Sequence, residues 1–347
     1  MTILGRTVRR EVVITLIIWL VLLVLACIGL ATLRASTSRI LHYIYYVNVS
    51  RGAKANVLYE EANKYAIRLL KDFEGLNEDS AAKVGIPSDS KDYLRSVQLF
   101  DEAMKYDPYP EFSTERIPHY EMLGQLYEAS SEPQVDALLM YARASMARGN
   151  YEGAERQIHI ALDRQSTATR SHVLLAQLRQ LQDRTTEGLA LLHDLSNMEP
   201  LDSKGYWVRA NLYQATGEGQ NALRDFEQAV VEAPDNIDYR KNFALALTAH
   251  KEDEKANRIM AEGLDLGGWQ DPAYLHVYGE MLIRGSQYEE AVRILKQADK
   301  LGPNSGDIQW SLASAYHYSG QARQAASTLN RAIAIRPELQ GRVFKDR

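Results

Sequence analysis

The sequence predicts an all-α fold: a right-handed superhelical solenoid of helical hairpins, preceded by a single N-terminal transmembrane helix. Two observations predict it. Six blocks of 34 residues follow one another between residues 135 and 339 and carry small residues at the same offsets. A repeat of this period is typical of stacked helical hairpins. Near the N-terminus, residues 12–33 contain no Asp, Glu, Lys or Arg, which is the pattern of a membrane span.

The first element is the N-terminal anchor. Residues 1–11 form a basic segment, and the apolar run from Val12 to Leu33 is bracketed by Glu11 and Arg34. As a helix this run reaches about 33 Å, enough to cross a hydrocarbon core of roughly 30 Å. The apolar core of a signal peptide is usually only about 7 to 15 residues long, so we expect an uncleaved anchor.

Cys27 leaves an alternative open. Residues 24–27 loosely resemble a bacterial lipobox, and Cys27 is the only cysteine of the chain. A lipoprotein would be cleaved before Cys27 and acylated on it, although its mature chain would then begin with the apolar residues 28–33. Both forms export the repeats, and the exported part has no cysteine with which to form a disulfide.

Arginines flank the expected span on both sides. The N-terminal set is the more tightly clustered: Arg6, Arg9 and Arg10 precede the span, and Arg34, Arg39 and Arg51 follow it. The positive-inside rule therefore favours an N-terminus in the cytoplasm, by a small margin. We expect a single-pass protein of the bacterial inner, cytoplasmic membrane, with its repeats in the periplasm or otherwise outside the cytoplasm.

A less regular region connects the anchor to the repeats. Residues 34–91 are expected to form a juxtamembrane helix and a linker, the linker being rich in Asn, Asp, Ser, Gly and Pro. The tyrosines between residues 43 and 46 lie at the headgroup level, or pack as the start of the helix, or both. Residues 92–134 are expected to form an irregular helical cap, as terminal units of repeat arrays often do. The pairing of its helices stays open.

The repeats fill blocks 135–168, 169–202, 203–236, 237–270, 272–305 and 306–339, and only Asp271 interrupts the register. Each block places two small residues twelve positions apart, which lets two helices approach closely: Ala142 and Ala154, Ala176 and Gly188, Ala210 and Ala222, Ala244 and Ala256, Gly279 and Ala291, Ala313 and Ala325. Residues 340–347 remain as a short C-terminal tail.

Turn residues separate these helices. Proline ends the second helix in four blocks, because it lacks an amide donor and clashes with the preceding turn: Pro200, Pro234, Pro303 and Pro337. Between the two helices, three blocks place a glycine where a chain reversal often needs a positive φ: Gly149, Gly217 and Gly320. The other three blocks depart from this choice and place Asp183, Lys251 and Ser286 there.

These positions resemble the tetratricopeptide repeat family, whose pattern is followed well by Tyr213, Phe226, Ala229 and Pro234. The resemblance covers about three fifths of the chain, and six blocks in one register make coincidence improbable. It implies a solenoid whose concave surface, lined by the first helix of each block, binds another protein.

A search for chemistry finds no phosphate-binding glycine loop, no paired-histidine helix motif, no cysteine cluster and no nucleophile elbow. The 8 histidines are scattered without metal-ligand spacing. The formal net charge is −5, with acids and bases interspersed. We therefore expect no enzyme, no cofactor, no metal site, no small-molecule substrate and no nucleic-acid partner.

In the resembling family the groove is lined chiefly by positions two, five, nine and twelve of each first helix. Position five holds Leu139, Val173, Trp207, Lys241, His276 and Trp310, and position nine holds Arg143, Gln177, Asn211, Leu245, Glu280 and Ser314. Tryptophan is enriched among binding anchors. The predicted partner contacts are Trp207, Asn211, Lys241, His276, Trp310 and Tyr318. The alternative is that each indole packs over the neighbouring hairpin.

Some family members bind a C-terminal carboxylate through Lys, Asn and Arg on successive first helices. Lys241 and Asn242 have suitable side chains, but Ala273 and Val277 stand in the next block, which disfavours this mode. We expect a membrane-anchored scaffold that recruits a protein partner through its groove, in bacterial envelope assembly, export or secretion. The alternative is an acylated lipoprotein that acts as a pilotin or assembly factor for an outer-membrane pore.

Overall fold

The computed structural model describes residues 2–3, 6–7, 51–78, 85–106, 111–130, 135–165, 169–198 and 200–341, and it divides into two compact units, residues 1–49 and 50–347. In the first unit, β1 (Thr2–Ile3) pairs antiparallel with β2 (Arg6–Thr7). The expected membrane span 12–33 and Cys27 lie outside the described residues. Among the helices that are described, none combines the length and the apolar character that crossing a bilayer requires.

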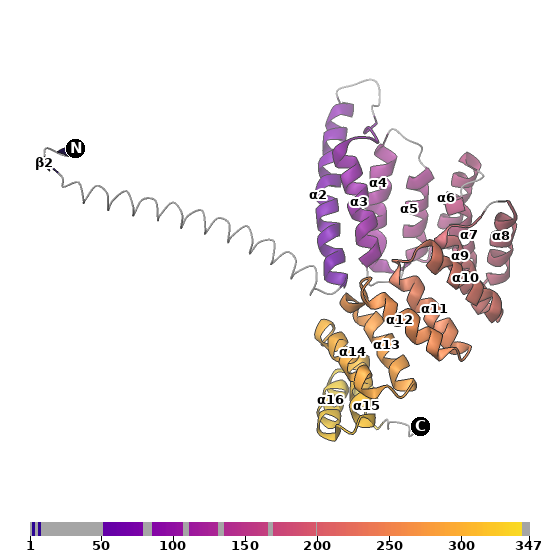
Figure 1. Cartoon of the computed structure of the whole chain (residues 1–347). Helices are drawn as coiled ribbons and strands as arrows, with labels where there is room; N and C mark the ends of the chain where they lie inside the picture. The colour runs from indigo at the N-terminus through magenta and orange to yellow at the C-terminus, as the bar shows by residue number, and fades with distance from the viewer. Residues whose placement is uncertain are drawn as a thin grey trace. The chain divides into compact units, whose positions relative to one another are not determined.

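The second unit begins with a helical hairpin of α2 (Arg51–Glu78) and α3 (Lys91–Tyr106) (Figure 1). Small side chains let the two helices pack closely, since Ala62, Ala66 and Ala103 are fully buried between them. The Ser96 hydroxyl donates a hydrogen bond of 3.1 Å to the Ala62 carbonyl across this contact. The pairing that the sequence left open for residues 92–106 is therefore with α2.

A single helix, α4 (Ile117–Ala129), stands between this hairpin and the first repeat, and the 3-10 turn η1 (Thr114–Arg116) leads into it. It packs against α2 and α3 on one side and α5 on the other. Gly124 makes the approach to α5 possible, because a Cβ at this position would lie 2.7 Å from the Tyr141 ring. Leu123 and Leu126 of α4 are buried in one hydrophobic cluster with Ala62, Ala66 and Ala103 of the α2–α3 hairpin.

Six helical pairs follow, one in each block. Their bounds are α5 (Val135–Ala147) with α6 (Tyr151–Arg164), α7 (Thr169–Leu181) with α8 (Thr185–Met198), α9 (Ser203–Ala215) with α10 (Gly219–Glu232), α11 (Ile237–Ala249) with α12 (Asp253–Leu264), α13 (Pro272–Arg284) with α14 (Tyr288–Leu301), and α15 (Gly306–Tyr318) with α16 (Ala322–Ile335). Short 3-10 turns η2 (Gly268–Gln270) and η3 (Pro337–Leu339) precede α13 and follow α16. The predicted all-α repeat solenoid is confirmed in the described residues of the second unit.

The small residues of each block lie where the two helices of a pair touch. Ala142, Ala154 and Ala244 are fully buried. Gly279 shows how little room exists, because a Cβ there would lie 2.4 Å from the Leu295 Cγ atom of the partner helix. The repeated choice of Ala and Gly is thus a steric requirement of close helix packing.

The turn between the helices of a pair has the same left-handed backbone in all six blocks. The three glycines have φ of 74°, 82° and 77°, and the non-glycine residues Asp183, Lys251 and Ser286 have φ of 59°, 64° and 60°. The sequence marked these three as departures from the glycine rule. The structure shows that the hairpin geometry imposes the conformation even where a side chain makes it costly.

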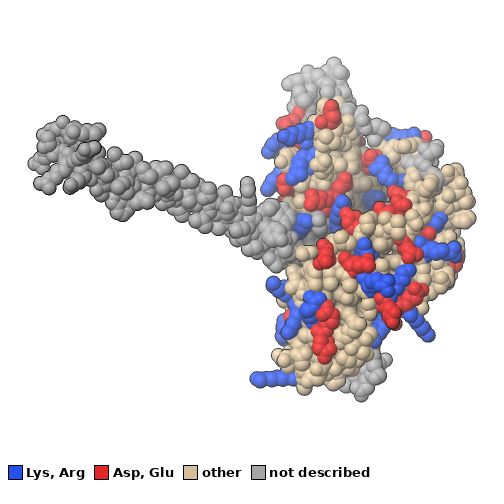
Figure 2. All heavy atoms as spheres, in the orientation of Figure 1, with Lys and Arg blue, Asp and Glu red and all other residues tan. Residues whose placement is uncertain are grey.

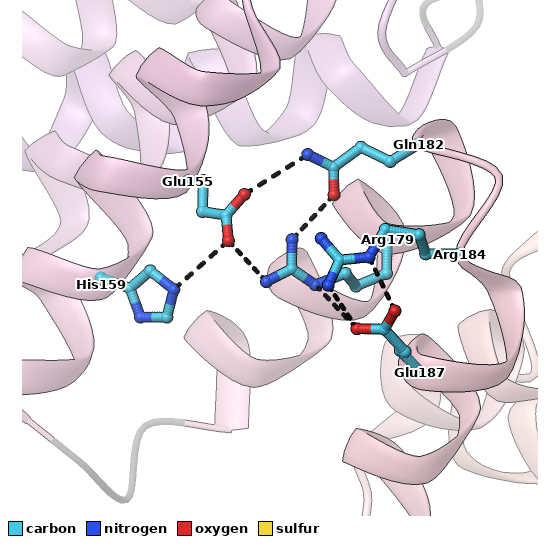
Figure 3. A network of polar contacts seen from close by, with 6 residues as sticks. All are labelled: Glu155, His159, Arg179, Gln182, Arg184 and Glu187. Carbon is cyan, nitrogen blue, oxygen red and sulfur yellow. Dashed lines mark hydrogen bonds and ion pairs between the residues drawn. The ribbon is translucent and has the colours of Figure 1, made fainter.

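A polar network around the buried side chain of Arg179 joins the first two blocks (Figure 3). The guanidinium of Arg179, on α7, donates to Glu155 of α6 at 2.6 Å and to Gln182 at 2.7 Å. Arg184 and Glu187 form a second pair beside it, with two hydrogen bonds of 2.7 and 2.5 Å. The hydrogen bond from Arg179 outweighs burial and lowers the pKa of Glu155 to about 2. This network stabilises the junction between two hairpins.

Candidate partner-binding surface

First helices of several successive blocks touch one another. The first helix α7 packs against the first helices α5 and α9, and the first helix α13 packs against α11 and α15. Among the described residues, the second helices of successive blocks pack less closely against one another. We call the surface formed by positions two, five, nine and twelve of the first helices the groove.

Trp207 lies partly buried in the middle of this surface, on α9. Its indole stacks on Tyr239 of the next block with ring centroids 5.8 Å apart, and the ammonium of Lys204 lies 4.3 Å from its centre. The indole also packs against two hydrophobic clusters. The side chain of Asn211 donates to the Trp207 carbonyl at 2.7 Å. Trp207 thus takes part in packing between repeats, and part of its surface remains in the groove.

Lys241 and His276 occupy position five in the next two blocks. The ammonium of Lys241 is 2.9 Å from Asp238, and its side chain is 20 % exposed. The Nε2 atom of His276 is 2.9 Å from the Ser311 hydroxyl, which donates to Glu280 at 3.0 Å. The hydrogen bond from His276 lowers the pKa of Glu280 despite partial burial.

This Ser, His and Glu arrangement does not match a catalytic triad. In a triad the acid binds the histidine nitrogen opposite the one that faces the nucleophile. Here Nε2 of His276 faces both the Ser311 hydroxyl, at 2.9 Å, and a Glu280 oxygen, at 3.4 Å. The three side chains therefore form a polar junction between α13 and α15.

The remaining predicted residues lie on α15. Trp310 is partly exposed, and its carbonyl accepts a hydrogen bond of 3.0 Å from Ser314. The ring of Tyr318 stacks on Tyr288 of α14, with centroids 5.4 Å apart. Tyr318 thus faces a second helix, whereas Trp310 belongs to the position-five column.

The structure adds a residue that the sequence did not indicate. Glu111 belongs to the turn that precedes η1, and its carboxylate is held by three groups from three blocks. Arg143 of α5 donates to it at 2.6 Å, Gln177 of α7 at 3.0 Å and Lys204 of α9 at 2.5 Å. We call these three residues the cradle. Arg143 and Gln177 hold position nine of their first helices, and Lys204 holds position two. The carboxylate therefore lies in the groove.

Opposing effects act on this carboxylate. Burial raises the pKa of Glu111, because its side chain is only 18 % exposed, but Lys204 and Arg143 outweigh burial and lower the pKa to about 2. The Tyr120 hydroxyl also donates to the Glu111 carbonyl at 2.6 Å. The sequence shows a basic or amide side chain at position nine of the first three blocks. It gives no sign of Glu111, which lies up to 93 residues from its partners. Only the fold brings them together.

Surface charge is mixed on the face shown in Figure 2, where acidic and basic side chains alternate and neither sign forms one continuous patch. Within the described residues, no group of three or more His, Cys, Asp or Glu side chains has a metal-binding arrangement.

The comparisons with known proteins agree with this architecture. The sequence model of the tetratricopeptide repeat matches residues 282–343, while no curated protein matches the chain. Among solved structures, the crystal structure of the Cut9–Hcn1 hetero-tetramer of the APC/C has a TM-score of 0.52 and 12 % identity, and covers 71 % of this chain and 50 % of that one. This chain therefore spans about half the length of that relative.

Two further structures are similar over a shorter stretch. YrrB, described as a TPR protein with an unusual peptide-binding site, has 18 % identity and a TM-score of 0.46, over 52 % of this chain and 93 % of its own. MamA from Desulfovibrio magneticus RS-1, from residue 41 to its end, has 14 % identity and a TM-score of 0.45, over 50 % and 97 %.

The fold defines the class of this protein as an α-helical repeat solenoid. The family model of the tetratricopeptide repeat matches residues 282–343, and the likeness to the Cut9–Hcn1 structure concerns the fold.

Proposed function

We propose that this protein is a membrane-anchored scaffold that recruits a protein partner through its groove, in bacterial envelope assembly, export or secretion. The observation that carries the proposal is the surface of the last three blocks. Leu245, at position nine of α11, is 40 % exposed. It shares the first-helix face with Lys241, His276 and Trp310, each of which is partly exposed. An apolar residue among polar groups in a concave surface is suited to binding a protein segment.

The anchor rests on the apolar run 12–33 of the sequence. A membrane tether confines the scaffold to a thin layer, which raises the effective concentration of a bound partner for other membrane proteins. The alternative is an acylated lipoprotein that acts as a pilotin or assembly factor for an outer-membrane pore. Replacing Cys27 with Ser separates the two: an anchor helix keeps its full-length intact mass and its membrane association, whereas a lipoprotein loses both processing and acylation.

Site-specific photo-cross-linking in cells tests the groove. A benzoylphenylalanine is placed at Leu245, and the control places it at Val231, which is 64 % exposed on the second helix α10. We expect a discrete cross-linked partner from position 245 and none from position 231. His276→Ala should reduce the yield at position 245, while His193→Ala, an exposed position on α8, should not. Equal products from both positions would contradict the proposal.

A further inference from the structure

The turn formed by residues 111–113, here called the Glu111 turn, crosses the groove of the first three blocks. Its carboxylate reaches partners that lie 32, 66 and 93 residues further along the chain. Next to it, Phe112 packs against the hydrophobic cluster of the first block, which includes Val135 and Leu139. A carboxylate and an aromatic ring from one short segment thus occupy the first-helix surface of the first three blocks.

The residues around the turn retain hydrogen-bonding capacity. The Nε atom of Arg143, the Oε1 atom of Gln177 and the indole nitrogen of Trp207 are buried, and none of them has a hydrogen-bond partner among the described residues. Unsatisfied buried polar atoms are rare and costly. Two of these three atoms belong to cradle residues, and the third belongs to the indole of Trp207, which lies next to the Lys204 ammonium. Two donors and one acceptor are groups that can pair with the carbonyl and amide groups of a peptide backbone.

We propose that the Glu111 turn is an internal ligand of the groove: it occupies the cradle in place of an acidic segment of the partner. This inference rests on the proposed function and specifies its chemistry. The partner segment carries a carboxylate followed by an aromatic side chain, because Glu111 and Phe112 show that the surface accepts this pair. The partner binds the first three blocks only when the Glu111 turn has left them. The turn therefore reduces the apparent affinity of the groove for the partner, according to the fraction of molecules in which the turn has left.

The charge of the cradle supports an acidic ligand. Arg143 and Lys204 contribute two positive charges, and Gln177 contributes a neutral donor. A single carboxylate neutralises only one of the two. Burying cations without enough anions is unfavourable, so an acidic segment fits this part of the groove better than a neutral one.

The test uses the full-length chain in a mild non-ionic detergent and a fluorescein-labelled peptide with the sequence of residues 107–116. Glu111→Gln removes the internal carboxylate. Glu115→Gln is the matched control, because Glu115 is exposed and lies outside the cradle. By fluorescence anisotropy, we expect the Glu111→Gln variant to bind the peptide at least about tenfold more tightly than the unmodified chain or the control. A peptide with Gln in place of its first glutamate should lose about tenfold.

Equal binding by the unmodified chain and both variants would overturn the inference, as would a folded Glu111→Gln variant that does not bind the peptide. A second measurement covers a variant that fails to fold. The unmodified chain is labelled with 5-fluorotryptophan, and its Trp207 resonance is assigned with Trp207→Phe. Adding the peptide at millimolar concentration should shift this resonance, because Lys204 links the ring to Glu111. No shift at saturation would also overturn the inference.

The two proposals fail in different ways. If cross-linking at Leu245 captures a partner but the peptide never competes with the Glu111 turn, the proposed scaffold function is supported. The inference that the turn is an internal ligand is then wrong. If the peptide binds the Glu111→Gln variant but no partner is captured at Leu245, the cradle is a carboxylate site and the placement of the partner on the last three blocks is wrong.

Discussion

Replacing Glu111 with Gln removes one buried charge with little change of shape, and its effect can be worked out from the structure. The cradle lowers the pKa of Glu111 from 4.5 to about 2. One pKa unit corresponds to about 1.36 kcal/mol, so the ionised carboxylate stabilises the docked turn by roughly 3 kcal/mol relative to the neutral acid. We expect Glu111→Gln to lower the free energy of opening of the turn and α4 by about this amount at pH 7.

The same contribution should depend on pH. Because the pKa of Glu111 is lower in the folded than in the unfolded state, its stabilisation is complete above about pH 5 and is lost as the pH falls through 2. The difference between the unmodified chain and Glu111→Gln should therefore shrink to about half at pH 3. Other carboxylates, such as Glu155, titrate in both proteins and cancel in this comparison.

Native-state amide exchange of the full-length chain, read by mass spectrometry for residues 111–130 and corrected for intrinsic rates, measures this free energy. A loss of about 3 kcal/mol accelerates exchange roughly a hundredfold or more at pH 7. Glu115→Gln, which leaves the cradle intact, should exchange like the unmodified chain. Exchange of Glu111→Gln within about threefold of the unmodified chain, or an equal difference at pH 7 and pH 3, would refute the reasoning.

Three further predictions concern stability and can be measured by thermal and urea unfolding followed by circular dichroism. Lys251→Gly should stabilise the array by about 1 kcal/mol, because Lys251 has a φ of 64° that glycine adopts without strain; a loss would show that the lysine side chain compensates. Gly279→Ala should cost about 1 to 3 kcal/mol, since its Cβ would meet Leu295 at 2.4 Å, while Gly285→Ala, whose nearest atom is 3.5 Å away, should change little. Similar values for the two glycine variants would contradict this account. Arg179→Ala should cost about 1 to 3 kcal/mol by removing the guanidinium that donates to the Glu155 carboxylate, and the loss should become smaller below about pH 4; a loss independent of pH would assign the effect to packing.

Much of the solenoid could be predicted from the sequence, because its rules act over short distances. The residues twelve positions apart, such as Ala142 and Ala154, report that two consecutive helices touch, and any larger side chain would separate them. The period of 34 residues then places every hairpin without knowledge of the rest of the chain. The turns were predicted only in part: glycine marked three of them, whereas Lys251 adopts the same backbone against its own preference.

The N-terminal region and the groove depended on contacts between distant segments. Nothing local to residues 92–106 shows that their partner is α2, because that contact depends on the path of the intervening linker. Trp207 was predicted either to anchor a partner or to pack between repeats; the structure shows the packing on Tyr239 and leaves the binding role as a proposal.

By itself the sequence determined the class of this protein: the repeated small residues, the prolines and the register specify helical hairpins that stack, because each of these signals concerns neighbours in the chain or in the next helix. The tertiary structure alone placed the Glu111 carboxylate between Arg143, Gln177 and Lys204. A charge finds such partners only when several repeats have stacked and brought their first helices to one surface, and no spacing along the chain encodes that distance.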